Sequence, residues 1–360
     1  MRPLRLPFAI VLGLFTLLVA APAWACGGLV NTNGSVTLVR TTTLAAYHEG
    51  IEHYVTSFEF AGGEGEFGSI IPLPGVPTKV IRGGDWTLQR LVQETQPQPE
   101  AIAFAAGSTA AADTARVILK TEIDALDIVV LEGGGKAVGD WAREHGFFLP
   151  PDAPEVLDFY AERSPIFMTV RFDASRAAEQ GLGAGDGTPV HVVIPTTNPW
   201  VPLRILGLGA GADAPVEADV YLLTDLAPAT LPEPLTPGLA ARLPRGVRPG
   251  LVLERSEEAS TSLLADLRSD KGMGWLPSSG MWLSYLRVDS RAGDLDYDLA
   301  IDASGAGQPS PVAAGLDPKA TTGAAGLRSF GPALWTALAV LILLGVVGTL
   351  ERRRAGRPAV

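Results

Sequence analysis

One uncharged stretch near the C-terminus constrains this chain more than any other feature of its 360 residues. Residues 331–350 carry no charged side chain and consist mainly of Leu, Val, Ala, Gly and Ile. As an α-helix they would span about 30 Å, the thickness of the hydrocarbon core of a bilayer. Arginines follow within residues 351–360. We therefore predict a transmembrane helix over residues 330–350 and a basic cytoplasmic tail over residues 351–360, because basic flanks stay on the cytoplasmic side.

The N-terminus has the pattern of a secretory signal. Arg2 and Arg5 form a basic start, and residues 6–20 form a short apolar run. Small residues then surround a cleavage site after Ala25. An uncleaved membrane anchor is the alternative, but the short run and the good site favour a signal peptide over residues 1–25. Together with the C-terminal span, this predicts a single-pass protein of the cell membrane, with its N-terminal domain outside and its C-terminus cytoplasmic.

Two features leave the processing of the ends open. Cleavage would make Cys26, the only cysteine, the first residue, as in a bacterial lipoprotein. The bulky Trp24 disfavours a lipidation site, so an ordinary cleaved N-terminus is preferred. At the other end, the apolar run and its arginines also match a sorting signal that is cut and replaced by another anchor. No Leu-Pro-x-Thr-Gly motif occurs, which favours retention of the span.

The charge distribution restricts the partners. The whole chain has a formal net charge of −11, although its two termini are basic, so the intervening region is strongly acidic. A nucleic-acid-binding surface needs clustered basic residues, and none is evident. We therefore expect no nucleic-acid partner. The expected partners are the membrane itself and an unidentified envelope ligand or protein.

Composition and patterning predict a strand-rich α+β fold over residues 26–302. The 41 Gly and 29 Pro imply many turns, and most apolar segments are short and β-branched. We expect a mainly antiparallel sheet with three or four helices, followed by a flexible stalk over residues 303–329. Strands are expected at residues 36–44, 51–60, 116–119, 127–131, 166–172, 190–194, 201–206, 218–223, 282–288 and 295–301. Helices are expected at residues 86–93 (capped by Asp85), 136–145, from 152 to before 165, and 257–267.

The segment Pro72-Leu-Pro74-Gly-Val-Pro77 is the most distinctive local feature. Three prolines within six residues exclude a helix and a central strand, so the chain must run extended and stiff here. The segment could form an exposed ledge that contacts a partner. The preferred interpretation is a rigid connection that fixes the following helix on the sheet.

Several motifs follow one another in a fixed order along the chain: Cys26-Gly-Gly, the proline segment, the helix after Asp85, residues 141–150, residues 156–160 with the Phe167 strand, and Pro202-Leu-Arg204. This order resembles the bacterial domain-of-unknown-function family numbered 2330. The resemblance covers roughly residues 26–302, and it departs from the family at Phe67-Gly-Ser, where members tend to have a tryptophan. Because that family has no assigned activity, the resemblance implies architecture and location only.

Two patterns in the sequence resemble metal-binding sites. His48-Glu49 and His53 suggest zinc, but their histidines are five residues apart, and a metalloprotease helix needs four. The aspartates near the C-terminal strands suggest calcium, but the spacing lacks the Gly and Glu of an EF-hand loop. We interpret Asp294, Asp296 and Asp298 as one solvated face of a strand. The calcium candidates are Asp289, Asp294, Asp296, Asp298 and Asp302.

No catalytic, cofactor-binding or metal-binding residue is assigned from the sequence. No Gly-x-Ser-x-Gly elbow occurs, Cys26 has no evident base, and Gly133-Gly-Gly135-Lys136 lacks phosphate-loop spacing. Glu64-Gly-Glu66 is interpreted as a solvated hairpin tip. The leading hypothesis is a non-catalytic envelope protein that binds a ligand or partner. The alternative is an envelope hydrolase built from scattered acidic residues, which a pocket with pKa-shifted carboxylates would favour.

Overall fold

The computed structural model describes most of the region between the two predicted membrane-directed segments. All described residues except Leu316 belong to one compact unit, Met1–Gly315. The predicted signal peptide, Cys26, the Glu64-Gly-Glu66 tip, the predicted span and the basic tail lie outside the described residues. Among the residues that are described, no helix is both long and apolar enough to cross a membrane. The described ranges are 29–31, 37–61, 67–95, 115–181, 187–237 and 250–316.

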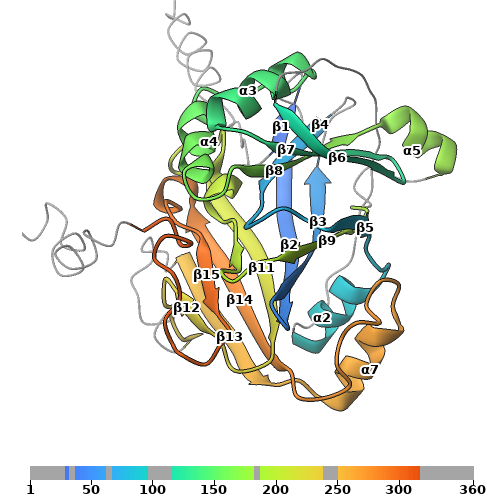
Figure 1. Ribbon diagram of the computed structural model, residues 1–360, viewed down its shortest axis with the longest axis vertical. Coiled ribbons are helices and arrows are strands. Elements are labelled where there is room, and N and C mark those ends of the chain that lie inside the picture. The colour runs from blue at the N-terminus through green and yellow to red at the C-terminus, as the bar shows by residue number, and fades with distance from the viewer. Residues whose placement is uncertain are drawn as a thin grey trace, which may run out of the picture. The chain divides into compact units, whose positions relative to one another are not determined.

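A seven-stranded sheet forms the centre of the unit (Figure 1). Its neighbouring strands are antiparallel except for the parallel pair β11 and β2. Glu49 and Gly50 form the tight turn between β2 and β3, both with positive φ, in the gap between the strands predicted at residues 36–44 and 51–60. Across the sheet the strands are β13 (Gly250–Glu258), β14 (Trp282–Arg291), β11 (Pro215–Thr224), β2 (Thr37–His48), β3 (Ile51–Ala61), β9 (Val190–Pro195) and β5 (Lys79–Arg82).

Two smaller antiparallel sheets accompany it. The five-stranded sheet contains, in order, β1 (Leu29–Asn31), β4 (Phe67–Pro72), β8 (Ile166–Phe172), β7 (Leu126–Glu132) and β6 (Arg116–Ile123). The three-stranded sheet contains β10 (Trp200–Val201), β15 (Leu299–Asp302) and β12 (Ala229–Leu231). The predicted α+β class with mainly antiparallel strands is therefore confirmed.

The described residues contain five α-helices, one more than the upper prediction of four. In Figure 1, α3 and α4 lie together beside the five-stranded sheet, and α2 and α7 lie together beside the seven-stranded sheet. The additional helix, α5, follows β8 in the interval between the strands predicted at residues 166–172 and 190–194, where no helix was predicted. The helices are α2 (Thr87–Thr95), α3 (Gly135–Glu144), α4 (Ala153–Ala161), α5 (Ala174–Gln180) and α7 (Thr261–Ser269), with 3-10 turns η1 (Arg204–Gly207) and η2 (Ala292–Asp294).

The seven-stranded sheet is buried on both faces. One face packs against side chains of the two smaller sheets, such as Ile128 and Met168. The other face packs against leucines of α2 and α7. In β3, Tyr54 belongs to the first core and Val55 to the second. The polar side chains of Glu52, His53 and Thr56 are buried in this strand as well, so neither of its faces is purely apolar.

Helix α2 begins where the sequence predicted, but Asp85 does not cap it. Asp270, which follows α7, accepts hydrogen bonds from the Trp86 N–H at 3.2 Å and from the Thr87 N–H at 2.7 Å. It also accepts from the Thr87 hydroxyl at 2.6 Å. Asp85 instead pairs with Arg82 on β5. The cap therefore joins α2 to the end of α7, which a local sequence pattern cannot reveal.

Two predicted strands near the three-stranded sheet are wrong in extent. The 201–206 segment leaves β10 after Val201 and turns into η1. In the 295–301 segment only the last residues are paired, as β15. Strand β13 was also missed, because its end was assigned to the helix predicted at residues 257–267.

Residues 303–316, the first part of the predicted stalk, fold onto the domain. Asp302 accepts from the Ser304 N–H at 2.8 Å and from the Gln308 N–H at 2.8 Å, which closes the chain into a compact loop. The Ala314 side chain is fully buried, and its carbonyl accepts from the Asp298 N–H at 2.9 Å. The described part of the predicted stalk is therefore bonded to the domain, and residues 317–329 lie outside the described part.

Candidate functional site

A groove of about 580 Å³ opens at the end of the seven-stranded sheet where β3 begins and β9 ends. Four separate segments meet there: the β2–β3 turn, the proline segment, the β9–β10 connection and the folded 303–316 segment. The residues that line it are Gly50, Pro74, Arg163, Pro195, Thr196, Thr197, Asn198, Trp200, Ser310, Val312 and Ala313. The proline segment thus contributes one wall through Pro74, in addition to connecting β4 to β5.

Backbone contacts hold these segments in place. The Thr78 N–H donates to the Val193 carbonyl at 2.8 Å, and the Thr196 N–H donates to the Gly50 carbonyl at 3.1 Å. At Gly75 an added Cβ would lie 3.2 Å from the Pro195 carbonyl oxygen, so the proline segment approaches β9 as closely as a glycine permits. The wall beside β9 is therefore the proline segment, which is stiff and whose continuation is hydrogen-bonded to β9.

Arg163, just after α4, lies at the base of the groove, and its side chain is only 8% exposed. Its guanidinium donates to the Phe159 carbonyl at 3.1 Å, to the Ala313 carbonyl at 2.7 Å and to Asp298 at 2.6 Å. It also lies 4.0 Å from the Phe159 ring centroid and 5.2 Å from that of Trp200. Arg163 is thereby fixed in one orientation beneath the opening.

Asp298 is the anionic partner of Arg163 and is completely buried. Besides Arg163, it accepts hydrogen bonds from the Tyr160 hydroxyl at 2.8 Å, the Leu203 N–H at 2.7 Å and the Arg204 N–H at 3.1 Å. Burial raises the pKa of Asp298, and Arg163 with the other donors opposes that rise. The predicted solvated position of Asp298 is therefore wrong, because its donors draw the carboxylate into the interior.

A second buried carboxyl, Glu52 on β3, lies behind the groove and does not line it. Within the described residues, neither of its oxygens has a hydrogen-bond partner. Burial raises the pKa of Glu52 to about 8, and a backbone contact with Trp200 works weakly in the opposite direction. Glu52 is therefore held mainly in its neutral form near pH 7. No pattern in the sequence indicates this, since Glu52 looks like an ordinary polar position of an alternating strand.

The mouth of the groove is polar but uncharged. Thr196, Thr197, Asn198 and Ser310 bring hydroxyl and amide groups, and Thr197 and Asn198 are exposed. Among the described residues that line it, no carboxylate, histidine or cysteine occurs. A nucleophile in the groove would lack a side chain to accept its proton. The arrangement is therefore suited to hydrogen bonding with a ligand rather than to acid–base chemistry.

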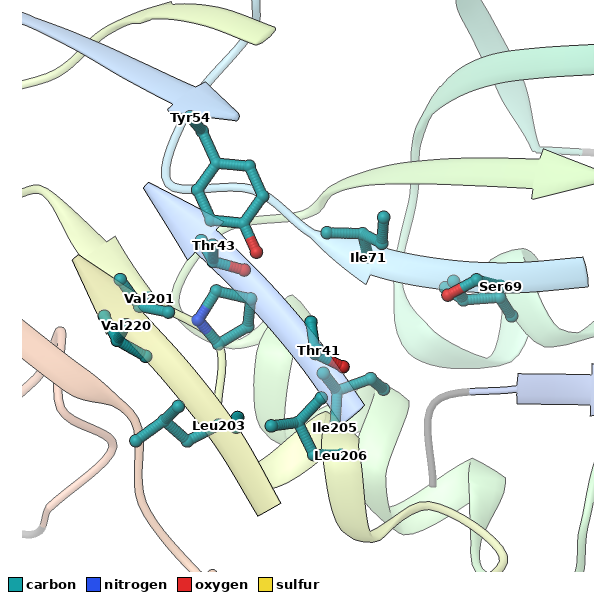
Figure 2. Close-up of a pocket in the computed structure, with 13 residues that line it drawn as sticks. Thr41, Thr43, Tyr54, Ser69, Ile71, Val201, Leu203, Ile205, Leu206 and Val220 are labelled. Atoms are coloured by element: carbon teal, nitrogen blue, oxygen red, sulfur yellow. The ribbon is translucent and has the colours of Figure 1, made fainter. Parts of the chain in front are cut away.

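A small internal cavity lies on the face of the seven-stranded sheet that carries the Tyr54 side chain (Figure 2). In Figure 2 the Tyr54 hydroxyl points toward Thr43 on β2, and Thr41 lies further along the same strand. The volume of about 20 Å³ is enough for roughly one water molecule. The Thr41 hydroxyl has no partner among the described residues. The cavity is too small for a metabolite.

A histidine pair occupies the opposite face of the sheet. His53 Nδ1 lies 2.9 Å from His191 Nε2, and the His53 ring stacks on Trp275 with centroids 3.5 Å apart. Burial lowers the pKa of His53 to about 3, with His191 adding to the effect, and lowers the pKa of His191 to about 4. The sequence missed this pair because the two residues are 138 positions apart.

The metal candidates from the sequence are separated by the structure. His48 contacts Asp225 at 2.6 Å, away from the buried His53. Of the calcium candidates, Asp289 lies beside Arg287 and Asp294 beside Arg291, while Asp302 closes its own loop. No group of three or more potential metal ligands is present among the described residues.

The glycine-rich turn before α3 is a packing feature. An added Cβ at Gly135 would lie 2.5 Å from the Asp158 backbone nitrogen on α4. The missing side chain therefore lets α3 and α4 approach each other closely. Lys136 pairs with Asp140 on its own helix, so the turn has the structure of a strand-to-helix connection.

A model of a family described as uncharacterised proteins conserved in bacteria, domain of unknown function 2330, matches residues 20–229, more than half of the chain. No curated protein sequence matches it. Among solved structures, a mutated baculovirus P35 after caspase cleavage is similar at 9% identity and a TM-score of 0.33, covering 73% of this chain and 99% of that chain. Baculovirus P35 is similar at 10% identity and a TM-score of 0.36, covering 74% of this chain and 97% of that chain. Similarity at this level carries no argument about fold or function.

Proposed function

This chain belongs to the bacterial family of uncharacterised proteins numbered 2330, and on that premise we propose that it is a membrane-anchored, extracytoplasmic, non-catalytic binding protein. Its ligand site is the groove between the β2–β3 turn, the proline segment, the β9–β10 connection and residues 303–316. The observation that carries the proposal is the lining of this groove, which offers hydrogen-bonding groups without an acid–base pair. Its volume lies in the range of small-molecule sites.

The sequence supports the membrane-anchored part of the proposal. A cleavable signal over residues 1–25 would export the domain, and residues 330–350 would hold it at the bilayer. The folded unit ends close before that segment, so the groove would be displayed outside the cytoplasmic membrane. Its acidic surface keeps such a domain soluble.

The anchoring is tested by the intact mass of the mature protein isolated from membranes, with both ends mapped. The expected protein starts at an unmodified Cys26 and ends at Val360. A lipid mass on Cys26, or an end near residue 330, would replace this topology with a processed one.

The binding site is tested by native mass spectrometry of the full chain in lipid nanodiscs, after incubation with small soluble fragments of the bacterial envelope. A bound mass should appear with wild type and with Val117→Trp, but not with Val312→Trp. Val312 lies in the groove and is 56% exposed, whereas Val117 is 41% exposed on β6. A bound mass that persists in Val312→Trp, or none in any variant, contradicts the proposed site.

The second candidate function is an envelope hydrolase, and Glu52 is the observation that favours it. A buried carboxyl with a raised pKa is a typical general acid. Glu52 would need access to the groove, from which it is now fully shielded. Turnover of envelope glycans by wild type that is lost in Glu52→Gln, with the fold retained, would establish the hydrolase and remove the non-catalytic proposal.

A further inference from the structure

We infer that the groove binds a neutral oligosaccharide, an inference that rests on the proposed binding function and names its ligand class. Three features point to this ligand class: the charge of the lining, the kind and placement of its polar groups, and the pairing of the neighbouring strands. Each of these is a property of the described residues around the opening.

The groove offers no net charge to a ligand. Arg163 is the only charged side chain among the described residues that line it, and Asp298 lies 2.6 Å from its guanidinium. An anionic ligand would have to compete with this buried pair. A cationic ligand would find no carboxylate in the lining. A neutral ligand meets neither penalty, and it can still accept a hydrogen bond from the edge of the guanidinium, which has five N–H donors.

The remaining polar groups are alcohols and an amide, interleaved with apolar surface. Thr197 and Asn198 line one side of the opening, and Ser310 lies on the 303–316 segment. Pro74 and Val312 place apolar surface beside them. Sugar rings present the complementary pattern, with hydroxyls along their edges and C–H groups on their faces. Side chains that both donate and accept suit hydroxyls, which do the same.

The strands beside the groove disfavour an extended peptide as the ligand. Peptides commonly bind by adding a strand to a free sheet edge. Strand β9, which leads into the groove, is paired with β3 along one edge and with β5 along the other. Strand β9 therefore offers a peptide no free edge over Val190–Val193, the part that is paired on both sides. An oligosaccharide needs no free strand edge.

The test is isothermal titration calorimetry with the full chain in lipid nanodiscs, a preparation that avoids detergents with sugar headgroups. The probes are three neutral disaccharides (chitobiose, cellobiose and maltose), an anionic disaccharide containing glucuronate, and a proline-rich hexapeptide. At least one neutral disaccharide should bind wild type and the Val117→Trp control. Val312→Trp should abolish binding, and Asn198→Ala should weaken it about tenfold, the value of one lost hydrogen bond. Thermal melting of each variant checks that the fold is retained.

The outcomes separate the ligand class from the site. If only the peptide or the anionic disaccharide binds, and Val312→Trp abolishes that binding, the oligosaccharide is wrong while the groove remains the site. If a neutral disaccharide binds equally to wild type and Val312→Trp, its site is elsewhere and the inference fails. If no probe binds, the oligosaccharide inference fails, and the native mass spectra with envelope fragments decide the binding function independently.

Discussion

Two carboxyl groups on the same side of the central sheet, Asp298 and Glu52, share full burial and a pKa raised by that burial, but they differ in their partners. Both are fully buried, and both lie close enough to Tyr54 to raise its pKa further. Asp298 has Arg163 beside it and three further donors. Glu52 has no hydrogen-bond partner for either oxygen within the described residues. Burying an acid costs free energy, and the two groups reduce that cost in different ways: Asp298 is paired and hydrogen-bonded, whereas Glu52 is held mainly in its neutral form.

This difference gives Asp298 a structural role, whereas Glu52 makes the stability of the fold depend on pH. The partners of Asp298 come from α4, η1 and the chain that follows β10, so the carboxylate joins segments that are distant in sequence. Glu52 has only the backbone contact with Trp200, and its neutral form is favoured near pH 7 because burial raises its pKa to about 8. Removal of the first group should break the fold locally, whereas removal of the second should change only how stability depends on pH.

Asp298→Ala should have the largest effect. The substitution leaves Arg163 buried without a counter-ion and removes the acceptor of two backbone N–H groups, so we expect a loss of about 3–5 kcal/mol. The free energy of unfolding from urea titration measures it. Asp294→Ala is the matched control, since Asp294 pairs with a partly exposed arginine and should cost less than about 1 kcal/mol. Equal losses in the two variants would show that Asp298 and its hydrogen-bond partners stabilise the fold no more than an exposed ion pair does.

Glu52→Gln should alter the pH profile of stability. With a folded pKa of about 8 and an unfolded pKa near 4.5, the wild-type domain is most stable relative to the variant below pH 4.5. That advantage is lost as the pH rises from 4.5 through 8. Between pH 5 and pH 7, stability should shift in favour of the variant by about 2–3 kcal/mol. Parallel profiles from urea titrations at these two pH values would mean that Glu52 is ionised in the folded domain.

The histidine pair should give the opposite pH dependence. The folded pKa values of His53 and His191, about 3 and about 4, lie below the ordinary 6.5. Their contribution to stability is present above pH 6.5 and is lost as the pH falls through 4. From pH 7 to pH 5, wild type should lose about 2 kcal/mol more than His191→Gln. The double variant Glu52→Gln/His191→Gln should have a flatter profile than wild type on both sides of neutrality, and curvature equal to that of wild type would contradict both assignments.

The smallest effect is expected at the internal cavity. Thr41 has a buried hydroxyl without a partner among the described residues, so Thr41→Val should be neutral or slightly stabilising. Thr43→Val is the matched variant, because the Thr43 hydroxyl bonds the Thr56 hydroxyl at 3.1 Å, and we expect a loss of about 1 kcal/mol. A comparable loss in Thr41→Val would indicate that a water molecule in the cavity satisfies its hydroxyl.

Local patterns in the sequence predicted the local structure well. The β2–β3 hairpin, the start of α2 and the helix that begins after Asp152 were all found from propensity and turn residues. The structure places the proline segment between β4 and β5, where the sequence predicted a rigid connection, but the sequence did not indicate that this segment forms one wall of the groove. That wall depends on close approach to β9, a strand more than a hundred residues later.

The candidate site was not predicted because its residues are assembled from distant parts of the chain. Asp298 meets Tyr160 across 138 positions and Leu203 across 95 positions. The aspartate looked solvated because alternation was the only information available for it. Asp270 similarly caps a helix that begins 183 residues earlier, and a nearby Asp85 offered a plausible but wrong local cap. Such partners follow from tertiary packing, which overrides local preference.

The folded 303–316 segment also makes the groove part of a mechanical connection. Any tension applied to the chain beyond residue 316 enters the domain through the carbonyls of Ala313 and Ala314, which accept from Arg163 and from the Asp298 backbone. These bonds lie outside the extended strand ladders, so they carry the load before the sheets do. Force along the chain would therefore peel away one wall of the groove first, while the strands behind it stay paired.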